Sequence, residues 1–486
     1  MKLKCSILIS IVLSLFLFAG CTSIGAEPVG LYTYDSNMEY ERLFNDDNKK
    51  EIILQISVEE WNKLDQSMLD YADRFQGDLR NDQYVLADFM YTDQFGSFTV
   101  KGVSLRTRGN LSRVRIQNDQ GEPQLSHFKI SFKEPLYLTE DSKASKAIDK
   151  RRVLGVSELN LKWNRNWDTS YVSEKFSYDL FTKMDLLSPS ITKAKFSIQI
   201  GSTLYYYGLY DVIESIDQDF LARRLGEEAS KGNLYKSLWQ SVGPATLIES
   251  YPPNAIGIRD VSRNYRPSYD LKTNKKANDT SDLVSFIINL NNLSGTSLKN
   301  YLEEHFEVDD YLKFLAIGVL LGNPDDYRAM GNNYYLYHNN LTGKFTMIPY
   351  DYDHGLGQGW DGWPVFTDHT IGADIYQWGN LNRQFNNPSH NSSHPLVDKI
   401  LSYTEYQLRY EQYLRQLTNP SNLLFIYSVF YSEYQQQRLL YDGDLHNAMH
   451  SLRFDLRNIQ DYMNRKSADI QQQLNYYNGN PGLRGT

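Results

Sequence analysis

Residues 322–359 read GNPDDYRAMGNNYYLYHNNLTGKFTMIPYDYDHGLGQG, and the rest of the chain is organised around this stretch. Two acidic clusters, Asp325-Asp326 and Asp351-Tyr352-Asp353, flank the pair Asn332-Asn333. Residues 334–338 and 344–349 have the composition of short strands, and an Asn- and Gly-containing turn separates them. We therefore predict a β-hairpin that brings both acidic clusters and the Asn pair to one edge.

Carboxylates crowded in this way repel one another unless a cation or a proton is shared between them. Oxygen ligands of this kind suit a divalent ion that also holds phosphate oxygens. Asp and Asn are also common in loops because they form turns. One such cluster would favour the turn interpretation, whereas two clusters that flank one hairpin favour a binding site.

The same residues resemble the spore coat protein H (CotH) family of atypical protein kinases. In that family an Asn-x-Asp-x-aromatic loop carries the catalytic Asp, and a later Pro-aromatic-Asp-Tyr-Asp loop carries the metal-binding Asp. Residues 323–327 (NPDDY) and 349–353 (PYDYD) fit these motifs, and the resemblance continues upstream through 208–214 (GLYDVIE) and 102–112. It implies an α+β, bilobal protein-kinase-like fold. An N-terminal antiparallel sheet lobe would precede a mainly helical lobe.

The resemblance also implies ATP-dependent phosphotransfer to a hydroxyl group, with protein Ser/Thr as the expected acceptor. Asp325 is the expected catalytic base, with Asp326 as the alternative, and Asp351 is the expected ligand of Mg²⁺ or Mn²⁺. Ordinary kinases have four residues between the base and a metal-binding Asn, whereas six separate Asp325 from Asn332 and seven separate it from Asn333. Either Asn therefore remains a candidate second ligand. Asp353 is either a further ligand or a loop cap.

In a kinase-like small lobe, a helix Glu pairs with a strand Lys that contacts the nucleotide phosphates. Glu174 lies in the first turn of a helix predicted to run to about residue 184. Lys129, within the alternating strands of residues 84–132, is the preferred Lys, and Lys162 is the second choice. The alternative for Glu174 is favourable placement of a carboxylate at a helix N-terminus.

Further candidates for nucleotide binding come from a loop and from the expected lobe junction. Arg106 and Arg108 belong to an Arg-Gly-Asn-x-Ser element, and paired arginines can hold phosphates by bidentate hydrogen bonds. The alternative is a solvated hairpin tip. Glu214 lies where the two lobes should join. Residues 249–282, rich in Pro, Asn, Lys and Asp, are expected to form a surface insertion.

The N-terminus predicts export and lipidation. Lys2 and Lys4 precede an apolar run over residues 5–20, which is short for a membrane span but typical of a signal peptide. Residues 18–21 (FAGC) resemble a bacterial lipobox, so Cys21 would carry the lipid. This implies a lipid-anchored protein of the bacterial cell envelope, at the outer membrane or cell surface. The expected boundaries are 1–20 signal peptide, 21–48 tether, 49–417 kinase-like domain and 418–486 helical extension with a frayed tail.

Composition limits the partners. The net charge of −9 argues against nucleic acid, which requires a basic face. The expected partners are therefore a nucleotide, a hydroxyl-bearing acceptor and, through the N-terminal lipid, a membrane. Two alternatives compete: a transition-metal hydrolase using Asp351, Asp353, His354 and His369, and a catalytically silent envelope lipoprotein. The second is a serious alternative because ATP is scarce outside the cytoplasm and a fold does not secure a function.

Overall fold

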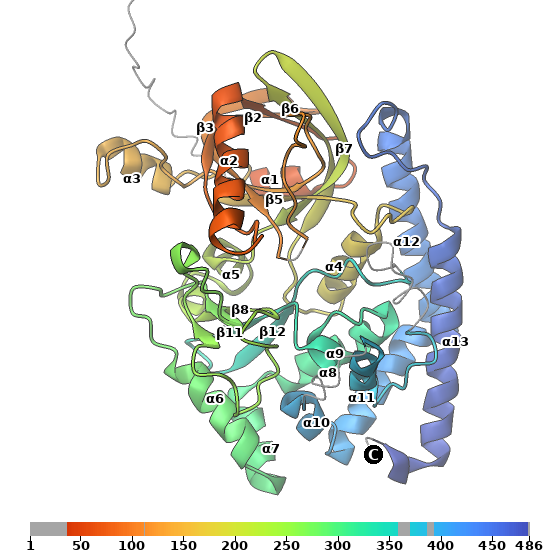
Figure 1. The fold of residues 1–486 in the computed structure, drawn as a ribbon. Helices are drawn as coiled ribbons and strands as arrows, with labels where there is room; N and C mark the ends of the chain where they lie inside the picture. The colour runs from red at the N-terminus through yellow and green to blue at the C-terminus, as the bar shows by residue number, and fades with distance from the viewer. Residues whose placement is uncertain (1–35, 111, 358–369, 386–392, 485–486) are drawn as a thin grey trace, which may run out of the picture. The chain divides into compact units, whose positions relative to one another are not determined.

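The computed structural model describes residues 36–110, 112–357, 370–385 and 393–484 (Figure 1). The expected signal peptide, the expected lipidation site Cys21 and the candidate ligand His369 lie outside these residues. From Asp35 onward the chain is one compact unit. Within the described segments, no helix combines the length and the apolar character needed to span a membrane.

The first seven strands form a closed barrel with the order β1-β2-β3-β4-β5-β7-β6. They are β1 (Glu51–Ile56), β2 (Val85–Asp93), β3 (Gly96–Arg108), β4 (His127–Ser131), β5 (Glu158–Trp163), β6 (Ile191–Ile200) and β7 (Thr203–Glu214). Neighbouring strands are antiparallel except β1 and β6, which pair in parallel from Glu51↔Lys195 to Ile56↔Ile200.

This barrel overturns part of the predicted fold class. An α+β mixture is present, but the predicted bilobal protein-kinase-like fold, with an N-terminal antiparallel sheet lobe and a mainly helical C-terminal lobe, is wrong. The reason is that β6 pairs with β1 as well as with β7, which closes the sheet on itself. Alternate residues of β1 and β2 are buried, as expected of strands with one face toward the barrel interior.

Two N-terminal helices pack on the barrel. In α2 (Val58–Arg74), Trp61, Leu64 and Met68 recur at helical spacing and are buried. The helix α1 (Ser36–Phe44) falls within the segment that the sequence predicted to be a tether. Burial of Leu43 in the barrel core holds this helix against the barrel.

A second, five-stranded sheet has the order β12-β11-β8-β10-β9. Its strands are β8 (Leu234–Ser237), β9 (Ile256–Gly257), β10 (Tyr269–Leu271), β11 (Tyr334–His338) and β12 (Phe345–Pro349). The predicted hairpin is β11–β12, with Tyr334 opposite Pro349. Residues 249–282 differ from the expected surface insertion. They supply β9 and β10, and Tyr269 and Leu271 are buried in the core.

The remaining helices are one beside the barrel, α3, several next to the second sheet, and those that continue to the C-terminus (Figure 1). They are α3 (Lys143–Asp149), α4 (Ser173–Lys183), α5 (Gln218–Leu225), α6 (Ser281–Asn292), α7 (Gly295–His305), α8 (Val308–Leu321), α9 (Tyr327–Met330), α10 (Pro395–Ile400), α11 (Thr404–Thr418), α12 (Pro420–Tyr441) and α13 (Arg457–Gly479). Helix α8 is apolar on nearly all sides and buried, and it ends at Gly322 in the left-handed conformation. The buried helix therefore leads directly into the Asp325 loop.

The C-terminal segment also contacts the barrel. Between α12 and α13, the backbone N–H of Met449 donates to the carbonyl of Tyr206 at 3.0 Å, and that of His450 donates to Tyr207 at 3.3 Å. Near the end of the chain, Arg484 Nε donates to Glu411 Oε1 at 2.6 Å. Residues 418–484 are therefore packed against the rest of this unit.

Candidate functional site

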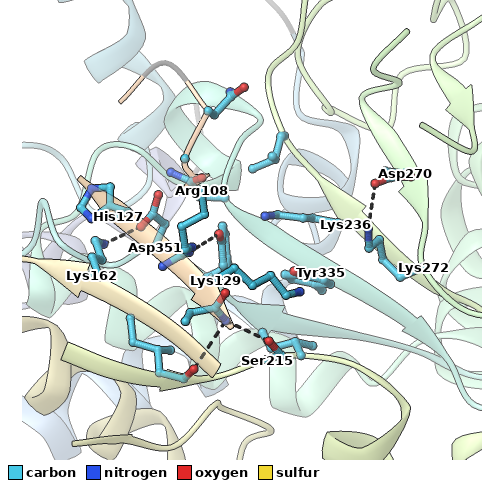
Figure 2. Close-up of a pocket in the computed structure, with 18 of the residues that line it drawn as sticks. Arg108, His127, Lys129, Lys162, Ser215, Lys236, Asp270, Lys272, Tyr335 and Asp351 are labelled. Atoms are coloured by element: carbon cyan, nitrogen blue, oxygen red, sulfur yellow. Dashed lines mark hydrogen bonds and ion pairs between the residues drawn. The ribbon is translucent and has the colours of Figure 1, made fainter. Parts of the chain in front are cut away.

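A cavity of about 520 Å³ lies between barrel strands β3, β4, β5 and β7 and the second sheet. Figure 2 shows Lys162 and Asp351 at one side, Lys272 and Asp270 at the other, and Lys129 and Lys236 between them. The predicted site residues that line it are Arg106, Arg108, Lys129, Lys162, Glu214, Asp325, Asn332, Asn333, Asp351 and Asp353. Most of the predicted residues, from distant parts of the sequence, thus lie around one space.

Lys162 is the central cation of the acidic side of the cavity. Its Nζ lies 2.8 Å from Glu174 Oε2, 2.6 Å from Asp351 Oδ1 and 2.9 Å from Asp353 Oδ2. Lys129, the preferred strand Lys from the sequence, instead pairs with Glu158 on the adjacent strand at 2.5 Å. The strand-Lys and helix-Glu pair is therefore present, and the Lys in it is Lys162.

One ammonium group here faces three carboxylates. Burial raises the pKa of Glu174 against the attraction of Lys162, and Asp353 and Asp351 raise it further. Burial would lower the pKa of Lys162, but the three carboxylates raise it well above its usual value. Burial would likewise raise the pKa of Asp351, yet Lys162 holds it below its usual range. Lys162 is therefore shared among three carboxylates, and the charges of Arg108 and Lys236 also act on Asp351.

Helix α4 holds the Asp351 loop in position. The backbone N–H of Asp351 donates to Tyr178 Oη at 2.8 Å, and that hydroxyl donates to Glu174 Oε1 at 3.3 Å. Asp351 has φ of +57°, which is uncommon outside glycine, although Asp tolerates it better than most residues. Such conformations cluster at functional sites, where surrounding contacts hold them.

Asp325 is buried and oriented by the Asn pair. Asn332 Nδ2 donates to its Oδ1 and Asn333 Nδ2 to its Oδ2, both at 2.8 Å. Burial raises the pKa of Asp325 to about 6, although His354 and the Asn332 hydrogen bond oppose the shift. A carboxylate with a pKa near the working pH is suited to accept a proton.

Asp326, the alternative base, has a different environment. Its side chain caps α9 by accepting the Ala329 N–H at 2.9 Å, and it is not among the cavity-lining residues. Burial raises its pKa to about 7. Of the two neighbouring aspartates, Asp325 is therefore the one that a ligand in the cavity can contact.

Two further cations, Arg108 and Lys236, flank the Asp351 loop, and only Arg108 was predicted from the sequence. Arg108 Nη2 donates to Tyr350 Oη at 2.9 Å, and Lys236 Nζ lies 4.0 Å from the centre of the Tyr350 ring. Lys236 was missed because it lies in a four-residue strand without a recognisable motif. His127 was missed too; burial and the charge of Arg108 lower its pKa well below the usual value, so it is neutral at neutral pH.

Two other candidates are engaged elsewhere. Arg106 Nη1 lies 3.0 Å from Asp82 Oδ1, away from the Lys162 cluster. The Glu214 carboxylate accepts hydrogen bonds from Tyr40 Oη at 2.7 Å and Arg224 Nη2 at 2.6 Å, and from the Ser190 N–H at 3.0 Å. These contacts tie α1 and α5 to β7, which is a structural role.

The donor chemistry fits a magnesium or manganese ion that arrives with phosphates. Among the residues described, no group of three or more His, Cys, Asp or Glu side chains is arranged to hold a metal ion by itself. Mg²⁺ commonly uses one or two carboxylates, retains water and takes substrate phosphates as its other ligands. Asp351, Asp353 and the Asn333 amide oxygen are donors of that kind. His354 Nε2 lies 3.7 Å from Asp353 Oδ1, but within the described residues these two and Asp351 do not form a three-ligand group. The transition-metal alternative therefore gains no support there.

Comparison with known proteins identifies the class of protein. A sequence model of the family described as "CotH kinase protein" matches residues 105–435, over half of the 486-residue chain, and the chain belongs to this family. It is also similar to the inner spore coat protein H of Bacillus subtilis (strain 168). The two are 25% identical over 289 residues, which cover 59% of this chain and 67% of the relative.

Proposed function

We propose that this protein is a metal-dependent phosphotransferase that moves the γ-phosphate of ATP to a hydroxyl group. The observation that carries the proposal is the shared cavity: the Lys162–Asp351–Asp353 cluster and the amide-held Asp325 line the same space. Phosphoryl transfer needs these elements, namely cations at the phosphates, carboxylates for a metal ion and one carboxylate that accepts a proton.

The cations of the cavity have a direct role in this proposal. Lys162, Arg108 and Lys236 would bind the phosphate oxygens and orient the γ-phosphate. Asp351, Asp353 and Asn333 would hold the metal ion, which when bound offsets negative charge on the phosphates. The Nη1 atom of Arg108 is buried and has no hydrogen-bond partner within the described residues, so one donor of this guanidinium is left unsatisfied by the protein.

Asp325 would take the proton in the transfer step. The acceptor oxygen forms a bond to the γ-phosphorus, the bond from that phosphorus to the β,γ-bridging oxygen breaks, and ADP leaves. The hydroxyl proton passes to the Asp325 carboxylate. A pKa of about 6 leaves this group mostly ionised at pH 7, as a base must be. Asn332 and Asn333 keep its oxygens oriented.

The acceptor and the location extend the proposal beyond the site. A protein Ser or Thr is the proposed acceptor. The relative is named as a spore coat protein. For this chain we propose an envelope location, with lipid attached at Cys21.

The test uses the full-length chain in mild detergent. ATP binding is measured by calorimetry with Mg²⁺ or Mn²⁺, and transfer of labelled phosphate is measured to a generic protein acceptor and to the chain itself. We expect metal-dependent ATP binding and labelling. Absence of nucleotide binding with both metals would overturn the proposal and favour a binding protein without catalysis.

A further inference from the structure

The cavity is also lined by a second cluster of charged residues, around Asp82, which has no role in the proposed transfer step. Asp82 Oδ1 lies 3.0 Å from Arg106 Nη1 and 3.5 Å from Arg113 Nη2, and Asp82 Oδ2 lies 2.8 Å from Arg259 Nη2. Arg266 is a fourth arginine whose charge acts on Asp82. These four arginines, which line the cavity with Asp82, are called the arginine chamber below.

The arginine chamber has a surplus of positive charge. Burial would raise the pKa of Asp82, but the charges of Arg106, Arg259 and Arg113 hold it well below its usual range. Burial lowers the pKa of Arg113 to about 9; the charge of Asp82 opposes this shift, and the charges of Arg106, Arg266 and Arg259 add to it. Crowding buried like charges around one carboxylate is unfavourable unless another anion joins them.

Unused hydrogen-bond donors give a second indication of a ligand. The Nε atoms of Arg113 and Arg266 are buried and have no hydrogen-bond partner in the part of the chain that the structure describes. The Arg113 side chain is only 4% exposed, and buried donors of this kind are normally paired. Guanidinium groups present their donors in a fork that matches phosphate oxygens.

The arginine chamber is separate from the cations proposed to hold ATP. Within the described residues, the chamber arginines form no ion pair with Glu174, Asp351 or Asp353. Figure 2 places Lys272 and Asp270 across the pocket from Lys162, with Lys129 and Lys236 between. The charges of Lys272 and Arg259 both lower the pKa of Asp270, so this far side of the cavity adjoins the arginine chamber. The cavity thus has two basic regions.

We propose that the arginine chamber binds a phosphate group carried by the acceptor, so that the preferred acceptor is already phosphorylated near the hydroxyl that reacts. The assignment to an acceptor rests on the proposed phosphotransferase function, whereas anion binding by the chamber does not. Arg266 Nη2 also donates to Tyr71 Oη at 3.2 Å, so the chamber links β10 to α2 as well. Because Tyr71 Oη is a neutral hydroxyl, this hydrogen bond does not offset the positive charge of the four arginines.

The first experiment titrates pyrophosphate into the full-length chain, with and without a saturating non-hydrolysable ATP analogue and Mg²⁺. Arg259→Gln should weaken pyrophosphate binding about tenfold, the scale of a lost charge-assisted hydrogen bond. Asp82→Asn should strengthen it, because the competing carboxylate charge is lost. Arg263→Gln is the matched control, since Arg263 lies on the same connection but is exposed and pairs with Asp260. Asp351→Asn should weaken binding of the analogue and leave pyrophosphate binding unchanged.

Thermal unfolding of each variant verifies that it is folded. Failure of pyrophosphate to bind the unmutated chain would overturn the proposal. The proposal would also be overturned if the analogue displaced pyrophosphate completely and Arg259→Gln weakened binding of both ligands equally. The chamber would then belong to the nucleotide site. Retained pyrophosphate binding without any ATP binding would instead reject the phosphotransferase function and keep the anion site.

The second experiment compares a serine peptide with the same peptide containing a neighbouring phosphoserine. The phosphorylated peptide should be the better acceptor, and Arg259→Gln should raise its KM about tenfold with little change in kcat. Equal use of the two peptides would show that the chamber binds free phosphate and would overturn the acceptor assignment.

Discussion

Lys162 Nζ lies 2.6 Å from Asp351 Oδ1, although the two residues are 189 positions apart in the sequence. Lys162 belongs to barrel strand β5, and Asp351 follows the hairpin β11–β12 of the second sheet. The ion pair therefore joins the two sheets at the cavity. Binding of a nucleotide and a metal ion would have to rearrange or share this contact, since Lys162 already satisfies part of the acidic charge.

Lys162→Met should weaken ATP binding by about tenfold or more, because a buried cation at the phosphates is lost. Lys129→Met is the matched control, since it removes a similarly placed strand Lys that pairs with Glu158. Calorimetric titration of both variants with ATP and Mg²⁺ measures the difference. A larger loss in Lys129→Met would return the role to the residue that the sequence alone favoured.

Asp325→Asn and Asp351→Asn should fail in different ways. Loss of the base at Asp325 should reduce phosphate transfer about a hundredfold or more and leave ATP binding nearly intact. Loss of charge at Asp351 should reduce metal-dependent ATP binding and transfer together. Asp461→Asn, an exposed substitution on α13, should change neither. If both site variants lost binding equally, Asp325 would have a binding role and the base would need another assignment.

Helix α8 should contribute strongly to stability. Leu315 is 1% exposed in the largest core cluster, so Leu315→Ala should lower the free energy of unfolding by about 2–5 kcal/mol through lost burial and a residual cavity. Leu408→Ala, at a side chain 51% exposed, should change it by less than about 1 kcal/mol. Urea denaturation measures both values. Similar values for the two variants would contradict the packing assigned to α8.

His450 should make stability depend on pH. Burial lowers its pKa to about 4 from the usual 6.5, so the unfolded chain binds the proton more readily between these values. The free energy of unfolding should therefore fall as pH decreases from 6.5 to 4, by about 2 kcal/mol from this group. Because carboxylates also titrate in this range, the measurement compares the unmutated chain with His450→Gln by urea denaturation. Parallel pH profiles of the two proteins would refute the assignment.

Local patterns in the sequence predict the elements next to the site. The β11–β12 hairpin follows from its turn residues, and burial of α8 follows from its apolar residues on all sides. The Glu174 pairing was predicted as a type of contact, but strand position alone could not distinguish Lys129 from Lys162. That choice depends on which side chain reaches α4, which is a tertiary property.

Long-range pairings could not be predicted. Closure of the barrel depends on the parallel pairing of β1 with β6, beginning at Glu51↔Lys195. Neither strand contains a sequence pattern that indicates this partner. The arginine chamber is assembled from Arg106 on β3, Arg113 in the following loop, and Arg259 and Arg266 beside β10. Arg106 was a candidate phosphate-binding residue from its motif, but the other three arginines carry no signal in the sequence, and only the fold brings the four together.

The contact between Gly208 and His450 has a consequence for how the chain reaches its final state. Gly208 has φ of +119°, and a Cβ there would lie 2.6 Å from the carbonyl oxygen of His450. The segment after α12 therefore packs directly on the backbone of β7, although it is synthesised more than two hundred residues later. This part of β7 therefore stays uncovered until Met449 and His450 have been synthesised. A chain that ends before Met449 would leave this backbone surface exposed, and incompletely packed chains of this kind are prone to aggregation.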